Sequence, residues 1–216
     1  MEILLCPSMM CADFDALAED TRKLDEAGAD IFHMDVMDGA FVPNFALGLG
    51  DFNCVRKNTK KPLDVHLMVQ NPVPMVDLFA NAGADIIYVH YETDQHIAKT
   101  LGHIRELGKQ SGLVINPGTS YEQIECILPI VDWLMIMTVN PGFAGQKYLD
   151  YVDKKIIKAV EGKKEYGYKI SVDGAIGPDK VKKLSAMGVD AFVLGTSALF
   201  GKGDYKTSID KLKANE

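Results

Sequence analysis

Two histidines and two aspartates lie within or at the end of apolar runs that are typical of buried strands. His33 and Asp35 are two residues apart in IFHMDVMDGAFVPN (31–44), His66 lies in LDVHLMV (63–69), and Asp173 closes YKISVD (168–173). Side chains two residues apart in a strand point to the same face. Two imidazoles and two carboxylates are a suitable ligand set for zinc, manganese, iron or cobalt, and the residue types do not choose among these metals.

Each of these residues also has a purely structural interpretation. A single buried histidine is more often a hydrogen-bonded core residue, and an aspartate at the end of a strand often caps the following helix. The hypothesis of a metal site therefore depends on a fold that brings the four residues together. Asp38, just beyond Asp35, is expected to form a turn and not to bind a ligand.

The strands that must position these residues are predicted from short apolar runs, which alternate with helical patterns. Three of the helical patterns end in EAGAD (26–30), NAGAD (81–85) and AMGVD (186–190), where a glycine stops the helix before the next strand. Alternating strands and helices predict a parallel sheet. Eight such repeats predict an α/β fold, a single (β/α)₈ TIM-barrel domain over residues 1–216. The eight runs are 3–8, 30–36, 63–69, 85–90, 112–117, 133–139, 168–173 and 190–195.

A barrel places its active site at the C-terminal ends of the strands, so we expect the four polar residues to converge there. Glycine-rich segments follow the last three strands: NPGFAGQKY (140–148), DGAIG (173–177) and GTSALF (195–200). Backbone N–H groups in such turns bind phosphate without a cationic side chain. Glycines here also simply permit tight turns, but three adjacent loops together favour a phosphate site.

A metal, two aspartates and a phosphate site indicate one chemistry. A divalent ion that chelates the carbonyl and neighbouring hydroxyl of a ketose phosphate acidifies the carbon between them and stabilises the enediolate. An aspartate on each side of that planar species could remove a proton from one face and return one to the other. The outcome would be epimerisation.

The composition excludes several classes of function. The 216 residues carry a net charge of −7 and include three arginines. This acidic balance argues against binding of nucleic acid, which needs a basic surface. No run approaches the ~20 apolar residues of a membrane span, and an acid at position 2 argues against a signal peptide. The cysteines fall in no zinc-site spacing and are expected to be reduced thiols of a cytoplasmic protein. They are Cys6, Cys11, Cys54 and Cys126.

Seven motifs in order give the chain a resemblance to the ribulose-phosphate 3-epimerase family over essentially its whole length. They are CPSMMCADF, HMDVMDGAFVPN, LDVHLMVQNP, INPGTS, MTVNPGFAGQ, SVDGAI and LGTSALF. The resemblance implies an isomerase with one divalent cation per subunit, zinc first, with manganese, cobalt, iron or magnesium as alternatives. It implies that His33, Asp35, His66 and Asp173 bind this cation. It further implies Asp35 as proton acceptor and Asp173 as proton donor.

The same resemblance implies the residues that contact a small ketose phosphate, and a homo-oligomer, either dimer or hexamer. Ser8 and His66 would touch the sugar. The sugar-phosphate site would be lined by Gly142, Phe143, Ala144, Gly145, Asp173, Gly174, Ala175, Gly195, Thr196 and Ser197. Three methionines, Met37, Met68 and Met137, match positions around the intermediate, although methionines also simply fill gaps in cores.

Individual positions bear on the substrate. Cys11, Ala144 and Thr196 resemble the branch of the family that converts D-allulose 6-phosphate to D-fructose 6-phosphate, and we favour this reaction. Asn140 and Gly118 resemble the branch that interconverts D-ribulose 5-phosphate and D-xylulose 5-phosphate, which is the alternative. In addition, Ala175 stands where the family has the second glycine of DGG, which argues against a positive φ at this residue.

Other functions on the same barrel are less well supported. A Schiff-base aldolase needs a desolvated lysine near a strand end, whereas Lys147 lies beyond a loop and Lys169 lies at the other end of its strand. A related decarboxylase would need an Asp-x-Lys pattern, which DVMDG (35–39) lacks. A non-catalytic sugar-phosphate binding protein would be expected to have lost part of the acid–base pair, and both Asp35 and Asp173 are present.

Overall fold

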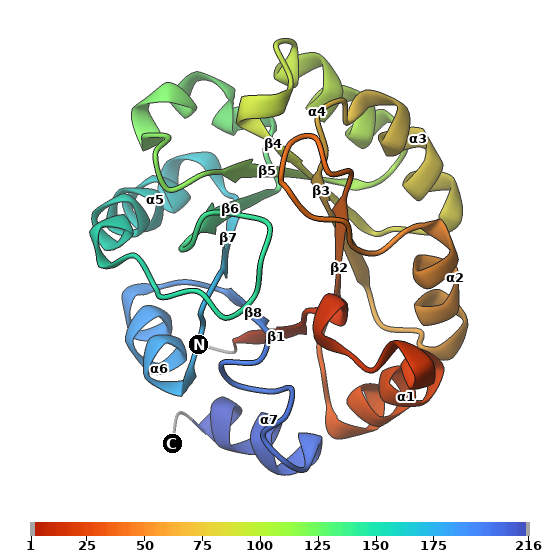
Figure 1. Ribbon diagram of the computed structural model, residues 1–216. Helices are drawn as coiled ribbons and strands as arrows, with labels where there is room; N and C mark the ends of the chain where they lie inside the picture. Colours follow the sequence, from red (N-terminus) through yellow and green to blue (C-terminus); the bar gives the residue numbers. More distant parts are fainter. Residues whose placement is uncertain (1–2, 215–216) are drawn as a thin grey trace.

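Eight parallel strands form the centre of the molecule, and helices surround them (Figure 1). The structure is a computed structural model that describes residues 3–214. From β2 to β8 each strand pairs with its sequence neighbour, and β1 pairs with β8. The predicted TIM barrel is therefore confirmed. The strands are β1 (Leu4–Pro7), β2 (Phe32–Met37), β3 (Leu63–Met68), β4 (Ile86–His90), β5 (Gln110–Ile115), β6 (Trp133–Met137), β7 (Lys169–Asp173) and β8 (Ala191–Leu194).

The barrel closes between β1 and β2, where the pairing is short. Within residues 3–214, one isolated bridge, from Ser8 to His33, joins the two strands at the carboxyl end. Towards the other end, the N–H of Asp30 donates to the carbonyl of Leu5. The other neighbouring strands are joined by ladders of two or more register pairs.

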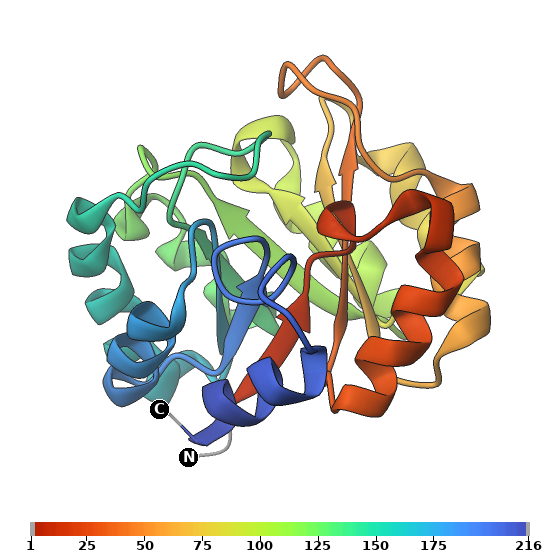
Figure 2. The same cartoon turned by 60° about the horizontal axis from the view of Figure 1, so that its bottom comes forward.

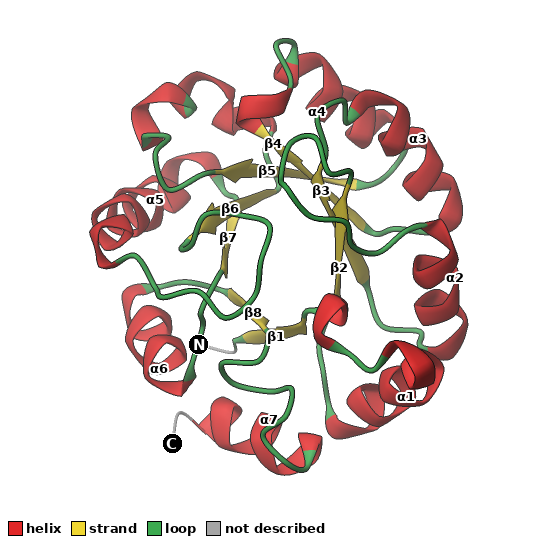
Figure 3. Ribbon diagram, in the orientation of Figure 1, coloured by secondary structure: helices red, strands yellow, loops and turns green. Residues whose placement is uncertain are grey.

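The helices lie outside the strands (Figure 3). The α-helices are α1 (Leu17–Ala27), α2 (Leu49–Asn58), α3 (Val73–Ala82), α4 (Ile97–Glu106), α5 (Asp153–Tyr166), α6 (Pro178–Met187) and α7 (Tyr205–Ala214). The 3₁₀ turns are η1 (Met9–Cys11), η2 (Phe14–Ala16), η3 (Tyr91–Thr93), η4 (Tyr121–Gln123), η5 (Glu125–Ile130) and η6 (Asp150–Val152). After β5, η4 and η5 take the place of an α-helix, and Pro129 lies inside η5. Proline lacks the N–H that a continuing helix needs.

The predicted glycine stops are confirmed. Gly28, Gly83 and Gly188 follow α1, α3 and α6 with φ values of 96°, 103° and 112°. This left-handed conformation ends each helix and turns the chain towards the next strand.

Four aspartates form a repeating pattern at the amino-terminal end of the barrel. Each precedes an even-numbered strand and accepts a hydrogen bond from a backbone N–H near the start of the preceding odd-numbered strand. The pairs are Asp30 with Leu5, Asp85 with Leu63, Asp132 with Ser111 and Asp190 with Ile170, at 2.9, 2.9, 2.8 and 2.7 Å. Each carboxylate also has a cationic partner from a helix, in the same order Lys213, Arg56, Arg105 and Lys163.

Apolar side chains fill both sides of the sheet, as a parallel sheet covered by helices requires. One cluster packs the helices against the strands. A second fills the barrel interior and includes Cys6, Tyr88, Val114, Trp133 and Met135. All four cysteines are free, as predicted. Among the described residues, no helix is both long and apolar enough to span a membrane.

Candidate active site

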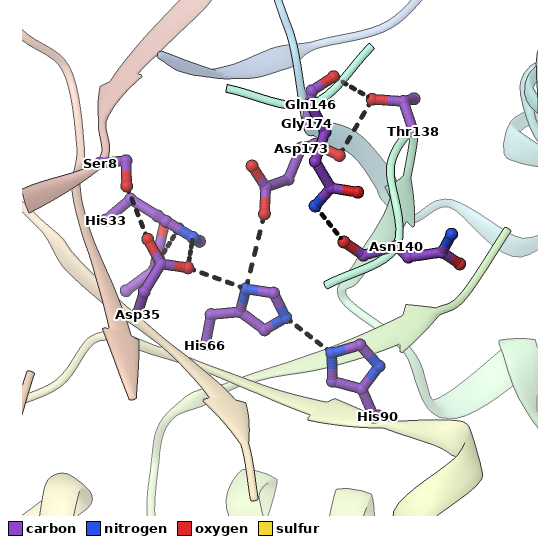
Figure 4. Close-up of polar contacts among 11 residues, drawn as sticks. Ser8, His33, Asp35, His66, His90, Thr138, Asn140, Gln146, Asp173 and Gly174 are labelled. Carbon is purple, nitrogen blue, oxygen red and sulfur yellow. Dashed lines mark hydrogen bonds and ion pairs between the residues drawn. The ribbon is translucent and has the colours of Figure 1, made fainter. Parts of the chain in front are cut away.

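The four residues predicted to bind a metal lie together at the carboxyl ends of the strands. His33 and Asp35 belong to β2, His66 belongs to β3, and Asp173 is the last residue of β7. One ligand atom from each lies within 4.8 Å of those of the others. In the register of β2 and β3, Asp35 is opposite His66, which places these two side chains next to each other (Figure 4).

The distances within this cluster suit a shared cation. Asp35 Oδ1 lies 3.1 Å from His33 Nε2 and 3.2 Å from His66 Nδ1. Asp173 Oδ2 lies 3.7 Å from His66 Nδ1. Ligands that bind one zinc ion at about 2.0–2.2 Å must lie at such separations from one another. The donor set can therefore hold a divalent cation, and it does not select one metal.

The ring nitrogens that face away from the cluster also have partners. His33 Nδ1 lies 2.5 Å from Asp64 Oδ1, an ion-pair contact without hydrogen-bond geometry, and His66 Nε2 lies 2.8 Å from His90 Nε2. A partner on the second ring nitrogen fixes the orientation of a metal-binding imidazole. Both imidazoles of the cluster are thus contacted on the ring nitrogen that faces away from it.

The two carboxylates differ in their electrostatic surroundings. Burial opposes ionisation of Asp35, but the adjacent His33 and His66 lower its pKa below the usual range. Burial and the nearby charge of Asp35 raise the pKa of Asp173 to about 7. A carboxylate with a lowered pKa beside one with a raised pKa is the arrangement expected of a base and an acid.

The histidines differ as well. Burial favours the neutral form of His33, but the Asp64 and Asp35 carboxylates outweigh it and raise the pKa well above the ordinary value. Burial lowers the pKa of His66, and it lowers that of His90 to about 4.

A pocket opens above the cluster, between the loops that follow β6, β7 and β8. Figure 2 shows the loop after β6 (teal) and the loop after β2 (orange) rising at the same end of the barrel. Of the residues expected to contact a sugar phosphate, His66 does not line the pocket and the others do. The lining members are Ser8, Gly142, Phe143, Ala144, Gly145, Asp173, Gly174, Ala175, Gly195, Thr196 and Ser197.

The predicted methionines also line this pocket. Met37 and Met68 pack with Val42, and Met137 belongs to the cluster inside the barrel. Both interpretations of these residues are thus compatible with the structure, since the methionines face the pocket and fill the core beneath it.

Hydrogen bonds hold the loops around the pocket. The Thr138 hydroxyl contacts the carbonyls of Asp173 and Gly174, at 2.9 and 2.5 Å (Figure 4). The Gln146 amide donates to the carbonyls of Asn140 and Phe143, at 2.6 and 2.9 Å. The loop after β2 joins them, because Asn44 Nδ2 donates to the Gly142 carbonyl at 2.7 Å.

Three individual expectations have definite outcomes. The expectation against a positive φ at Ala175 is wrong, because its φ is 55°. Asp38 forms a turn as predicted, since its Oδ1 accepts the N–H groups of Ala40 and Phe41. Ser8 faces the site, and its hydroxyl donates to Asp35 Oδ2 at 2.6 Å.

Sequence reasoning missed the residues that support the cluster. Asp64 contacts His33, His90 contacts His66, and Glu92 contacts His90. The alternation in LDVHLMV, which places Asp64 on the face of His66, was an available signal. A second signal was the histidine that closes the run DIIYVH (85–90).

The fold and the site define a barrel enzyme with a His/Asp cluster able to hold a divalent metal beneath a glycine-lined pocket. Residues 4–200 match the model of the ribulose-phosphate 3 epimerase family. The chain belongs to this family and is an epimerase, an isomerase that acts on carbohydrate phosphates.

Curated relatives match the whole chain. A ribulose-phosphate 3-epimerase of Synechocystis sp. is 44% identical, covering 96% of this chain and 91% of the relative. Another of Bacillus subtilis is 39% identical, covering 99% and 100%. Solved structures share the fold at low identity. A 3-hexulose-6-phosphate synthase has a TM-score of 0.74 at 18% identity, covering 100% of this chain and 99% of that one.

Proposed function

We propose that the protein inverts C3 of a ketose phosphate and interconverts D-ribulose 5-phosphate and D-xylulose 5-phosphate. The observation that carries the proposal is the His33, Asp35, His66 and Asp173 cluster beneath a pocket lined by three glycine-rich loops. Relatives named for ribulose phosphate, at 38–44% identity over nearly the whole chain, support the pentulose substrate.

The four clustered residues would hold one divalent cation, and zinc, manganese, iron and cobalt all accept this set of imidazoles and carboxylates. When bound, such a cation supplies Lewis-acid stabilisation of negative charge on the sugar oxygens. Both histidines are fully buried, and each has an outer partner that orients it. The site therefore meets the general requirements of a preorganised metal centre.

The protein's own groups account for the proton transfers. Asp35, held ionised by His33 and His66, is placed to accept the C3 proton, and Ser8 orients it through its 2.6 Å hydrogen bond. Asp173, whose pKa is raised to about 7 by burial and by the charge of Asp35, is placed to donate one. The two carboxylates reach the pocket from β2 and β7, so they can address different faces of a planar enediolate. Backbone N–H groups of the glycine-rich loops would bind the phosphate.

A preference for D-allulose 6-phosphate stays a prediction that the comparisons do not support. Cys11, Ala144 and Thr196, which suggested this preference, all line the pocket. They are therefore placed to influence whether the pocket accepts a five-carbon or a six-carbon sugar phosphate. The homo-oligomeric state, the cytoplasmic location and the extent of the domain likewise stay predictions.

The test is kcat/KM for both ketose phosphates, measured side by side on metal-loaded and chelator-treated protein. We expect chelator-sensitive turnover that favours D-ribulose 5-phosphate by about tenfold or more, which is ~1.4 kcal/mol of transition-state discrimination. A similar preference for the hexulose would overturn the assignment of the substrate and leave the reaction class intact.

The variant Asp173→Asn tests the two-base mechanism. It removes the carboxyl proton donor but keeps the side-chain size, so we expect epimerisation to fall by about 10²-fold or more while substrate binding persists. Exchange of the C3 proton with solvent, followed by NMR in deuterated buffer, measures the two steps separately. Activity within about tenfold of the wild type would contradict the role of Asp173.

A further inference from the structure

A chain of hydrogen bonds leads from the cluster to the loop after β5. His66 Nε2 lies 2.8 Å from Nε2 of His90, the last residue of β4 (Figure 4). His90 Nδ1 lies 3.3 Å from Oε2 of Glu92, in η3. The other oxygen of Glu92 accepts the N–H of Asn116 at 2.9 Å and the hydroxyl of Thr119. Three strand ends are connected in this way.

The outer end of the chain sets the direction of donation. A carboxylate only accepts hydrogen bonds, so Glu92 accepts from the Nδ1–H of His90. A neutral imidazole has one donor and one acceptor nitrogen, which makes His90 Nε2 an acceptor. With a cation bound beside Asp35 and Asp173, His66 then carries its proton on Nε2 and presents the Nδ1 lone pair to that cation. In the metal-free protein the Asp35 carboxylate, 3.2 Å from the same Nδ1, competes with Glu92 for the proton of His66.

The surroundings of the chain preserve this direction. Both imidazole rings are fully buried. The ring of Phe41, from the loop after β2, covers His90 at a centroid distance of 4.8 Å. A buried ring nitrogen that loses its partner costs about 1–3 kcal/mol, so alternative arrangements of the protons are penalised.

We propose that Glu92, acting through His90, is a positioning residue that fixes the tautomer in which His66 presents Nδ1 to a divalent cation. The inference rests on the proposed function, in which His66 is a metal ligand. His33 is oriented directly by Asp64, whereas His66 depends on a carboxylate two hydrogen bonds away. The loop after β5 thereby becomes part of the support of the metal site.

The isosteric variant Glu92→Gln tests this role because it should reverse the chain. The N–H of Asn116 can only donate, so it holds the amide oxygen and leaves the amide NH₂ facing His90 Nδ1. That nitrogen must then accept, and His90 carries its proton on Nε2. His66 Nε2 becomes the acceptor, and the proton of His66 moves to Nδ1, the atom intended for the cation.

Two measurements follow. The ¹⁵N shifts of the ring nitrogens, recorded on zinc-loaded wild-type protein, should show His66 protonated on Nε2 and His90 protonated on Nδ1. Competition with a chromophoric chelator should show a zinc dissociation constant about 10–100-fold higher in the variant. The control Glu106→Gln removes the same charge beside His103, which is exposed, and should change neither reading.

The outcomes separate this inference from the proposed function. A proton on His90 Nε2 in the zinc-loaded wild type overturns the inference even if the variant fails to fold. A folded variant whose zinc affinity stays within about twofold of the wild type overturns it too. Wild-type protein that binds no zinc contradicts the proposed metal site and the inference together, whereas zinc affinity that is retained in the variant contradicts the inference alone.

Discussion

Two adjacent residues after β7 shape the pocket in different ways. Gly174 has a φ of 118°, and an added Cβ would lie 2.8 Å from the backbone nitrogen of Val139. Ala175 has a φ of 55° and keeps its methyl group at a conformational cost of about 1 kcal/mol. Glycine is therefore required at the first position by both conformation and space, whereas the second position tolerates alanine.

We predict that Gly174→Ala lowers the free energy of unfolding by about 2 kcal/mol or more, because strain and a clash with backbone add together. Ala175→Gly should change it by less than about 1 kcal/mol, since relief of strain is offset by the greater freedom of the unfolded chain. Urea denaturation of both variants measures the difference. Equal stability of the two variants would contradict this account of the turn.

At the residue scale, the sequence predicted the members of the cluster and not their supports. His33, Asp35 and His66 were recognisable because polar side chains are unusual in apolar runs. The contact of His90 with His66 depends on how neighbouring strands and their side chains align, which single runs do not reveal. The positive φ of Ala175 was missed for a similar reason, because the surrounding loop imposes it.

At the scale of elements, the glycine stops made the alternation of strands and helices readable. The 3₁₀ turns after β5 were not predicted, although Pro129 was a signal. Because 3₁₀ turns take the place of an α-helix here, the loop after β5 is held by contacts with α5. Lys155 of α5 donates to the carbonyls of Asn116 and Pro117, at 2.6 and 3.1 Å.

This lysine gives a prediction of pH dependence. Burial lowers the pKa of Lys155 to about 8, from an ordinary value of 10.5. Between these values the unfolded chain binds more protons at this lysine than the folded protein does. The contribution of Lys155 to the free energy of unfolding therefore rises as the pH increases through this window. Its cost is fully present below about pH 8.

The variant Lys155→Met should remove this contribution. The stability of the wild type minus that of the variant, from urea denaturation across about pH 7 to 10, is expected to increase with pH. A difference that stays flat or falls with pH would show that the ammonium is not penalised by burial.

At the scale of the whole molecule, the chemistry and the stabilising contacts occupy opposite ends of the barrel. The four aspartates near the starts of the strands repeat one arrangement around the axis, each with a strand N–H and a helix cation. Three of these aspartates end the repeated motifs EAGAD, NAGAD and AMGVD. Their pairing with a strand N–H and a helix cation, however, emerges only once the units close into a ring.

We predict that Asp190→Ala lowers the free energy of unfolding by about 1–3 kcal/mol, because the N–H of Ile170 loses its acceptor. The zinc affinity should be unchanged, since Asp190 lies at the end of the barrel away from the cluster. Lys163→Met, which removes the ion pair and a hydrogen bond to the Gly188 carbonyl but leaves the acceptor of Ile170 in place, should cost less, about 1 kcal/mol or below. Denaturation and chelator competition check both variants, and a loss of zinc affinity in Asp190→Ala would contradict the separation.

The short pairing between β1 and β2 has a consequence for how the protein would hold a metal. Asp35 of β2 and Asp173 of β7 lie on either side of this junction, with β1 and β8 between them. A cation bound by both carboxylates would cross-link β2 to β7 across the weakly paired junction between β1 and β2. Opening of the barrel there would release the ion, and loss of the ion would ease the opening.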